Sequence, residues 1–172
     1  VDLYDTTVAQ ISTLKLQGKI VICYFSAGSY ENWRPDISAF PSSVIGKAMA
    51  GWAGEYWLDI RQLQILGPIM KNRMLLGVEK GCDGFDPDNV DEYTYTQKET
   101  NWPLNVTNQL AYNRLLADTA HSLGKLVALK NCQDLATTLL PWYDFAVVEQ
   151  CAQYDECALS SPFINAGKAV FE

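Results

Sequence analysis

The sequence predicts an α/β fold, a (β/α)8 barrel of the TIM type, on the strength of two observations. Short segments rich in apolar and β-branched residues alternate with longer helical segments, an order typical of parallel strands joined by crossover helices. Three helix-to-strand junctions also share one pattern, in which glycine ends a helix, lysine follows and a buried strand begins: QGKIVICYF, LGKLVALKN and AGKAVFE. Doubly wound sheets show the same regularity, so the pattern alone leaves both architectures open.

The expected elements follow in order along one domain, residues 1–172. Strands are expected at residues 2–5, 20–27, 56–60, 82–87, 126–131, 144–149 and 168–171. Helices are expected at residues 8–19, 66–81, 107–125, 132–143 and 161–168, with Thr107 as the N-cap of the third. Because an eight-stranded barrel usually needs about 200 residues or more, we expect a barrel that is incomplete at its ends.

Composition and charge exclude two classes of partner. Hydrophobic residues make up 48% of the 172 residues, and 13 basic against 20 acidic residues give a net charge of -7. Nucleic acids and anionic membranes both require a basic surface, so we expect neither as a partner. No run of about 18 apolar residues is present to span a bilayer. An acidic surface suits a cationic ligand, although solubility alone explains the same composition.

Three weak signals together favour a secreted protein, which we expect to be a monomer. The chain begins with Val1 rather than Met, which suggests processing. Five cysteines is an odd number, so at least one is free or pairs between chains, while Cys151 and Cys157 bracket a loop that a disulfide could close. Asn105 opens a sequon for N-glycosylation.

Polar residues follow the predicted strands at the ends where ligands bind in both candidate architectures. These carboxyl ends carry acids, amides and basic residues in succession: Tyr24, Ser26, Asp59, Arg61, Asp86, Asp88, Asn89, Asp91, Lys130, Asn131, Glu149 and Gln150. Each residue alone is more often a turn former or a cap. Their recurrence at successive strand ends nevertheless predicts a binding or catalytic site there.

Two common kinds of site do not fit this sequence. The only histidine, His121, lies at the end of a helix just before a strand, hence at the opposite end of the barrel. This excludes Ser-His and Cys-His triads and zinc sites built on histidine. The segment DPDNVDEY fails as a regular calcium loop, because Val90 and Asp91 occupy the positions that need an oxygen ligand and a glycine. We therefore expect no metal and no cofactor.

Carboxylates alone suffice for glycoside hydrolysis, in which one acid protonates the leaving oxygen and a second carboxylate acts as nucleophile or base. The best pair from two strand ends is Asp88 and Glu149. Glu149 follows the apolar run DFAVV, so we expect a poorly solvated carboxyl suited to a general acid. Asp83 and Glu92 are expected to be ordinary charges. Aromatic residues near the strand ends offer stacking surfaces for sugars or fill the core: Tyr30, Trp33, Trp52, Trp57, Tyr93, Trp102 and Tyr154.

Segments along nearly the whole chain resemble one family. GKIVICYFSAGSYENWRPD, GWAGEYWLDIR, KGCDGFDPDNVDEY, VALKN, FAVVEQCAQYDEC and PFINAGKAVF occur in the order and at the spacing of glycoside hydrolase family 114. The resemblance implies a (β/α)8 barrel that hydrolyses α-1,4-linked galactosamine polymers, at least partly de-N-acetylated, whose cationic sugars suit an acidic cleft. It implies Asp88 and Glu149 as the catalytic pair, and a cleft lined by Tyr24, Ser26, Asp86, Asn89, Asp91, Lys130, Gln150 and Tyr154.

The sequence departs from the family pattern in two respects. Val148 stands where the family usually has asparagine, which changes one hydrogen bond beside Glu149. Relatives carry a further strand upstream and continue past AVF, so we expect the first strand and the end of the last to be missing. Two alternatives stay open: a carbohydrate-binding or weakly active relative, and a small-molecule or metal-binding α/β domain.

Overall fold

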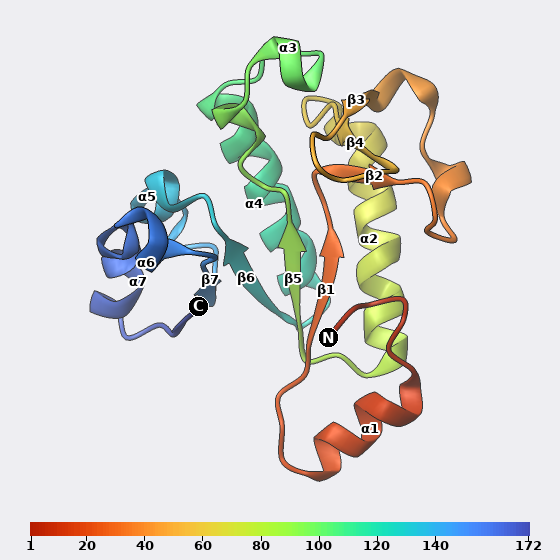
Figure 1. The fold of residues 1–172 in the computed structure, drawn as a ribbon. Coiled ribbons are helices and arrows are strands. Elements are labelled where there is room, and N and C mark those ends of the chain that lie inside the picture. Colours follow the sequence, from red (N-terminus) through yellow and green to blue (C-terminus); the bar gives the residue numbers. More distant parts are fainter.

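The computed structural model describes residues 1–172, and its centre is one open parallel sheet. The strand order is β1-β5-β6-β7-β8, and every neighbouring pair is parallel. The strands are β1 Ile22–Ser26, β5 Gly84–Asp88, β6 Leu126–Lys130, β7 Phe145–Val147 and β8 Val170–Phe171. The predicted α/β fold with barrel-type parallel strands is confirmed, and the carboxyl ends of the strands meet at one edge of the sheet (Figure 1).

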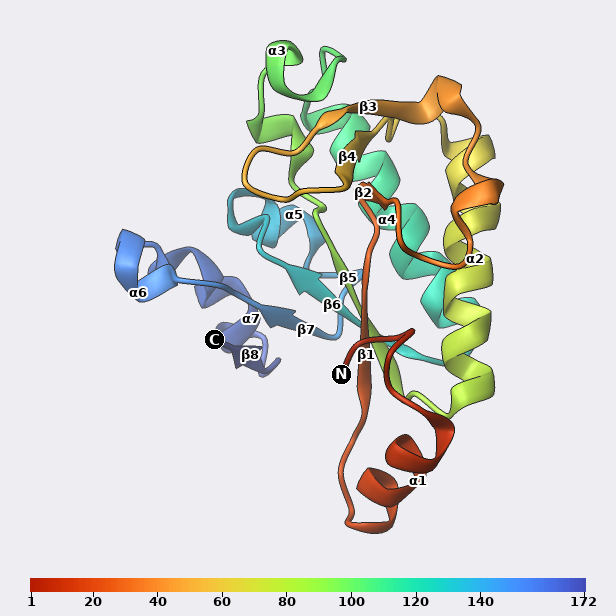
Figure 2. The same cartoon turned by 45° about the vertical axis from the view of Figure 1, so that its right-hand side comes forward.

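Two long helices, α2 Leu63–Lys80 and α4 Val106–Ser122, pack side by side on one face of this sheet (Figures 1 and 2). The remaining helices are short: α1 Val8–Leu16, α3 Gln97–Thr100, α5 Ala136–Leu139, α6 Cys151–Tyr154 and α7 Ser161–Asn165. Single 3₁₀ turns are η1 Ile37–Ala39, η2 Ser42–Val44, η3 Glu92–Thr94, η4 Gln133–Leu135 and η5 Cys157–Ser160. None of the helices combines the length and the apolar character needed to cross a bilayer.

The hydrophobic core lies between the sheet and these two long helices. Phe25 of β1 and Phe85 of β5 are completely buried and meet edge to face, with ring centroids 6.2 Å apart. Met70 and Met74 of α2 and Leu116 of α4 belong to the same buried cluster. Burial of each such side chain stabilises the fold by about 1.5–3 kcal/mol, so this cluster fixes the sheet that carries the strand ends.

The three glycine-lysine junctions behave as the sequence predicts. Gly18, Gly124 and Gly167 have φ of 74°, 68° and 73°, a backbone region that residues with a Cβ rarely adopt. The lysines after two of them hold neighbouring segments, since Lys125 Nζ donates to the Cys82 carbonyl at 2.7 Å and Lys168 Nζ to the Leu140 carbonyl at 2.6 Å. All three junctions lead into a parallel strand, which explains the repeated motif.

One predicted barrel strand belongs to a different sheet. Residues 56–60 fall on β4 Glu55–Leu58, the centre of an antiparallel sheet of order β2-β4-β3 with β2 Ser29–Glu31 and β3 Ile45–Ala48. The prediction was wrong because an aromatic, alternating segment suits either kind of sheet, and its neighbours decide which one forms. This small sheet stands beyond the carboxyl ends of β1 and β5 (Figure 2), where it forms a wall of the site described below.

The predicted strand at 2–5 reduces to a single parallel bridge between Asp2 and Tyr24. The chain turns immediately after it, because Asp2 Oδ1 accepts hydrogen bonds from the backbone N–H groups of Tyr4 and Asp5, at 2.8 and 3.0 Å. The start of α4 also differs from its prediction, since Asn105 rather than Thr107 is the N-cap and accepts from Asn108 N at 3.1 Å.

Candidate active site

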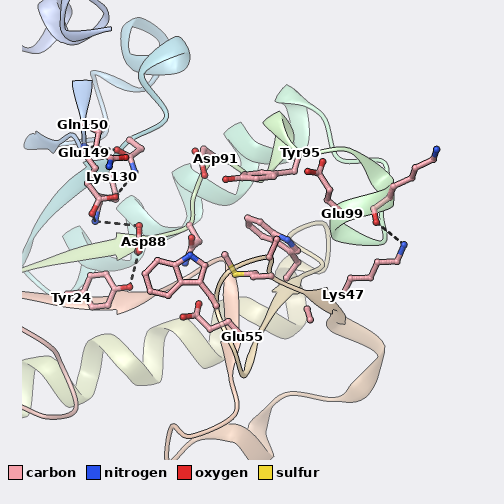
Figure 3. A pocket seen from close by; sticks show the side chains of 18 residues that line it. Tyr24, Lys47, Glu55, Asp88, Asp91, Tyr95, Glu99, Lys130, Glu149 and Gln150 are labelled. Carbon is pink, nitrogen blue, oxygen red and sulfur yellow. Dashed lines mark hydrogen bonds and ion pairs between the residues drawn. The ribbon is translucent and has the colours of Figure 1, made fainter. Parts of the chain in front are cut away.

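A cavity of about 750 Å³ lies between the carboxyl ends of the parallel strands and the small antiparallel sheet (Figure 3). Its 18 lining residues come from both sheets and from the loops between them. Acids outnumber lysines in this lining, with Glu55, Asp88, Asp91, Glu99 and Glu149 against Lys47, Lys98 and Lys130. The cavity therefore favours a cationic or polar ligand over an anionic one.

Lys130, the last residue of β6, gathers the carboxylates at one end of the cavity. Its Nζ lies 3.2 Å from Glu149 Oε1, 3.5 Å from Asp88 Oδ1 and 3.8 Å from Asp86 Oδ2. Burial by itself lowers the pKa of Lys130, but the three carboxylates outweigh it and raise the pKa above its ordinary value. Lys130 is thus a permanent cation at the centre of an acidic cluster.

Asp88 is held firmly at the end of β5. Its Oδ2 accepts a hydrogen bond from the Tyr24 hydroxyl at 2.9 Å, and its backbone carbonyl accepts from Ala27 N at 2.8 Å and Gly28 N at 3.1 Å. Burial, followed by the charge of Asp88, raises the pKa of Tyr24 well above its usual range, so the phenol stays a hydrogen-bond donor. The strand and the loop after β1 therefore fix both the backbone and the side chain of Asp88.

Glu149 follows β7 and is oriented by the neighbouring strand end. Asn131 Nδ2 donates to Glu149 Oε2 at 3.1 Å, and Glu149 N donates to Asn131 Oδ1 at 2.9 Å. The side chain of Glu149 is 59% exposed, so the poorly solvated carboxyl expected from the preceding apolar run is not found. Val148 is buried in the core, but the burial of the apolar run ends there, so the next residue, Glu149, is open to solvent.

Asp88 and Glu149 lie on either side of Lys130, as Figure 3 shows. Their nearest oxygens can be no more than about 7 Å apart, so the pair does not exceed the largest separation, about 9.5 Å, found between the two carboxyl groups of glycosidases. Both residues line the same cavity. Two carboxyl groups within reach of one bond, in a cavity of this size, are the arrangement that acid-assisted hydrolysis of a glycoside requires.

Comparison with known proteins identifies the family. The model of glycoside-hydrolase family GH114 matches residues 1–172. The chain belongs to family GH114. Among solved structures, Aspergillus fumigatus Ega3 in complex with galactosamine is 40% identical with a TM-score of 0.94, and the match covers 99% of this chain and 66% of that one. This chain thus spans 66% of the length of the Ega3 chain.

Two further solved structures share the fold alone. The glycoside hydrolase domain of PelA from Pseudomonas aeruginosa is 16% identical, with a TM-score of 0.68 over 98% of this chain and 72% of that one. Amy13B from Eubacterium rectale is 14% identical, with a TM-score of 0.60 over 84% of this chain and 34% of that one. A search of curated proteins found no match.

The structure divides the cleft residues implied by the GH114 resemblance into two groups. Besides the two acids, the cavity lining includes Tyr24, Asn89, Asp91, Lys130 and Gln150. Ser26, Asp86 and Tyr154 lie outside it. Ser26 is completely buried and its Oγ accepts from Asn89 Nδ2 at 2.9 Å, so it orients a lining residue and does not reach a ligand itself.

Asp86 and Tyr154 lie outside the lining for different reasons. Asp86 sits beneath Lys130, with one carboxylate oxygen buried and without a hydrogen-bond partner. Tyr154 ends α6, where it is 59% exposed and is not one of the residues that line the cavity. Asp59 and Arg61 also lie outside, since they pair with each other at 2.7 Å.

Two acids in or next to the cavity have perturbed pKa values. Burial, opposed by the Lys130 ammonium and reinforced by Asp88, raises the pKa of Asp86 to about 6. Burial and the charge of Asp88 raise the pKa of Asp91 to about 6 as well. Two neighbours of the expected catalytic pair therefore change their protonation state near pH 6.

The antiparallel sheet supplies Trp57, one of the aromatic residues expected near the strand ends, and Glu55, which the sequence did not single out. Glu55 and Trp57 alternate along β4 and both face the cavity, while Tyr56 between them does not. Ser29 Oγ donates to Glu55 Oε2 at 2.8 Å, and burial raises the pKa of Glu55. Tyr95 lies against Trp57, with ring centroids 4.5 Å apart. The alternation in EYW predicts that the first and third residues share one face of a strand, but it predicts a site only when β4 is known to form this wall.

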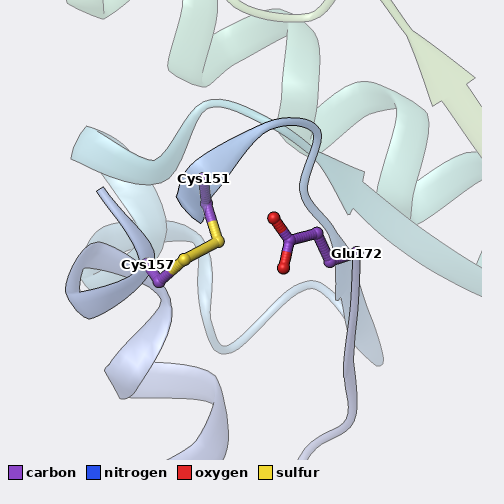
Figure 4. A group of neighbouring side chains, drawn as sticks. All are labelled: Cys151, Cys157 and Glu172. Carbon is purple, nitrogen blue, oxygen red and sulfur yellow. A yellow bond between two sulfur atoms is a disulfide. The ribbon is translucent and has the colours of Figure 1, made fainter. Parts of the chain in front are cut away.

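The other side chains that could bind a metal or act as a base lie outside the cavity, and each already has a partner within the protein. Cys151, Cys157 and Glu172 form a cluster, but the two sulfur atoms are joined in a disulfide, so no thiolate is left for a metal (Figure 4). His121 Nε2 lies 2.9 Å from Asp144 Oδ2 at the amino end of the strands, away from the cavity. This agrees with the structural role predicted for that histidine.

Proposed function

We propose that this GH114 chain is the catalytic part of a glycoside hydrolase that cleaves α-1,4-linked galactosamine polymers, with Asp88 and Glu149 as its carboxylate pair. The observation that carries the proposal is the placement of these two carboxylates on either side of Lys130 in one acidic cavity. Membership of family GH114 supports hydrolysis of a glycosidic bond. The galactosamine in the Ega3 complex supports the choice of sugar.

The geometry suggests a division of labour between the two acids. Glu149 is exposed toward the cavity and hydrogen-bonded by Asn131, so it can give its proton to the leaving glycosidic oxygen as the bond to the anomeric carbon breaks. Asp88 is fixed by Tyr24 and Lys130 and supplies the carboxylate that attacks the anomeric carbon or activates a water to do so. Either way the anomeric carbon ends bonded to an oxygen from water.

The lining supports a cationic sugar chain as substrate. An amino sugar without its acetyl group carries a positive charge at neutral pH, and Glu55, Asp88 and Asp91 present negative or polarisable oxygen to it. Trp57 and Tyr95 form an aromatic wall in which the buried Trp57 packs against Tyr95, and Tyr95, which is 39% exposed, offers the face on which a sugar ring can stack beyond the carboxylate pair. One cavity is lined by both the carboxylate pair and the aromatic wall (Figure 3), which suits an enzyme that binds within a polymer.

The disulfides support secretion. Cys23 pairs with Cys82 and Cys151 with Cys157, which leaves the buried Cys132 as the free cysteine. Disulfides persist in oxidising compartments and are rare in the cytosol, so we place the protein outside the cell, where exopolysaccharides occur. A monomeric state stays a prediction.

The proposal is tested by incubating the protein with de-N-acetylated galactosamine oligomers and analysing the products. Asp88→Asn and Glu149→Gln are each expected to lower kcat by about 1,000-fold or more while retaining binding. Glu79→Gln, which removes an exposed carboxyl from α2, serves as the matched control and is expected to leave kcat unchanged. Cleavage that survives both active-site substitutions would refute the assignment, and binding without cleavage by the wild type would identify a carbohydrate-binding relative.

A further inference from the structure

Glu92 is buried beneath the active site, although its position in an acidic loop predicts an ordinary surface charge. It opens η3, four residues after Asp88, and its exposed fraction is 0%. Neither of its carboxyl oxygens has a hydrogen-bond donor as partner. Burial without a donor strongly disfavours the ionised form of this carboxyl, so the protonation state of Glu92 has to be explained.

The carboxyl lies where hydrogen bonds join the loop after β1 to the loop after β5, a contact that we call the clasp. The loop after β1 donates Ala27 N and Gly28 N to the carbonyl of Asp88, and Asn89 Nδ2 donates back to Ser26 Oγ. The approach is so close that a Cβ on Gly28 would overlap the Asn89 carbonyl oxygen and lie 2.5 Å from Glu92 Oε1. Glu92 and the Asn89 carbonyl are therefore oxygen neighbours at the base of this clasp.

Two oxygen acceptors side by side repel each other unless one of them carries a proton. Burial is the main reason why the pKa of Glu92 is raised well above its usual range, and the negative charges of Asp91 and Asp59 act in the same direction. The side-chain amide of Gln109 in α4, the nearest donor, acts in the opposite direction without reversing the shift, and its Nε2 is already bonded to Asn113 Oδ1 at 2.9 Å, which leaves the Glu92 oxygens without a donor. The other titratable groups near it are Tyr112 of α4 and Cys132 before η4, both of which are neutral donors.

We propose that Glu92 is a positioning residue whose neutral carboxyl donates a hydrogen bond to the Asn89 carbonyl and so holds the clasp that fixes Asp88. Asn89 has a left-handed backbone, with φ of 58°, and a hydrogen bond to its carbonyl restrains that turn directly after the catalytic strand. The effect on catalysis rests on the proposed function, whereas the protonation of Glu92 is a property of the fold and can be measured without any substrate.

The first experiment measures urea unfolding of the wild type, Glu92→Gln and the exposed control Glu79→Gln between about pH 5 and about pH 8. The folded protein holds the Glu92 proton to a higher pH than the unfolded chain, whose pKa is near 4.5. The contribution of Glu92 to stability must therefore fall as pH rises above that value, and the urea midpoint of Glu92→Gln should rise steadily relative to that of the wild type. A gap that stays as constant with pH as that of Glu79→Gln would overturn the protonated carboxyl.

The second experiment follows kcat and KM against pH on galactosamine oligomers. Glu92→Gln keeps a neutral donor of similar size and is expected to retain kcat within about twofold and to lose less activity than the wild type at alkaline pH. Glu92→Leu fills the same space without a donor, and we expect kcat to fall by about 10- to 100-fold with a smaller change in KM. If folded Glu92→Gln loses as much activity as Glu92→Leu, the donor role is wrong. If the wild type is inactive, only the proposed function fails, because the urea experiment still reports on Glu92.

Discussion

At the scale of single residues, Lys130 controls the charge balance of the site. Only 6% of its side chain is exposed, and it lies within 3.8 Å of three carboxylates that would otherwise repel one another. Its ammonium lowers the pKa of Asp86 against the effect of burial. Lys130 therefore opposes the effect of desolvation on Asp86, and its removal takes away the cation that all three carboxylates share.

Lys130→Met is expected to reduce kcat/KM by about 100-fold or more and to move the acidic limb of its pH profile to higher pH. The sign follows from the loss of a cation, because without it Asp86 holds its proton at pH values above about 6. The profile is measured on galactosamine oligomers beside Lys71→Met, which removes an exposed lysine from α2 and should leave both limbs in place. An unmoved acidic limb would show that Lys130 does not govern these carboxyls.

Some residues of the candidate site could be predicted from the sequence and others could not, for physical reasons that the structure identifies. Asp88 and Glu149 could be predicted because each lies at the carboxyl end of a predicted strand, and ligands bind at that end of parallel strands. Glu92 was misread because burial depends on a loop that arrives from β1, and nothing local to DNVDEY signals that loop. The solvation of Glu149 was misread because the burial of a strand ends at its last inward-facing residue.

At the scale of elements, the antiparallel sheet β2-β4-β3 makes the cavity deep. It inserts between β1 and α2 in sequence and rises beyond the carboxyl ends of the strands, as Figure 2 shows. The helix-strand alternation and the glycine-lysine junctions identified the parallel part of the fold. They carry no information on an inserted antiparallel sheet, so β4 was assigned to the barrel and Glu55 was not predicted as a lining residue, although Trp57 of the same strand was expected near the strand ends.

The wall formed by β4 is expected to bind sugar units away from the scissile bond. Trp57→Leu should raise KM about 10-fold for long galactosamine oligomers and much less for the shortest substrate cleaved, because only long chains reach the aromatic wall. Tyr56→Leu, on the opposite face of the same strand, tests whether the effect comes merely from weakening the sheet. Equal losses for long and short substrates, or equal effects of the two variants, would argue against a binding wall.

At the scale of the whole molecule, the two disulfides differ in the length of chain that each one closes. Cys23 in β1 and Cys82 before β5 are 59 residues apart and join β1, at one end of the strand order, to the segment that leads into the neighbouring strand β5, whereas Cys151 and Cys157 close a short loop after Glu149. The short loop could be read from the sequence, because its cysteines are close neighbours in the chain. The long-range pair required the order of strands in the sheet, which the sequence pattern does not provide.

These positions predict that the two disulfides contribute unequally to stability and activity. Loop-closure entropy suggests that Cys23→Ala with Cys82→Ala lowers the free energy of unfolding by about 4 kcal/mol, and Cys151→Ala with Cys157→Ala by about 2 kcal/mol. The second pair should nevertheless reduce kcat more, because α6 begins at Cys151, directly after Glu149 and Gln150 in the active site. Urea unfolding and kcat measured on both double variants test this opposite ranking. If the variant that loses more stability also loses more activity, the short disulfide does not hold the catalytic loop.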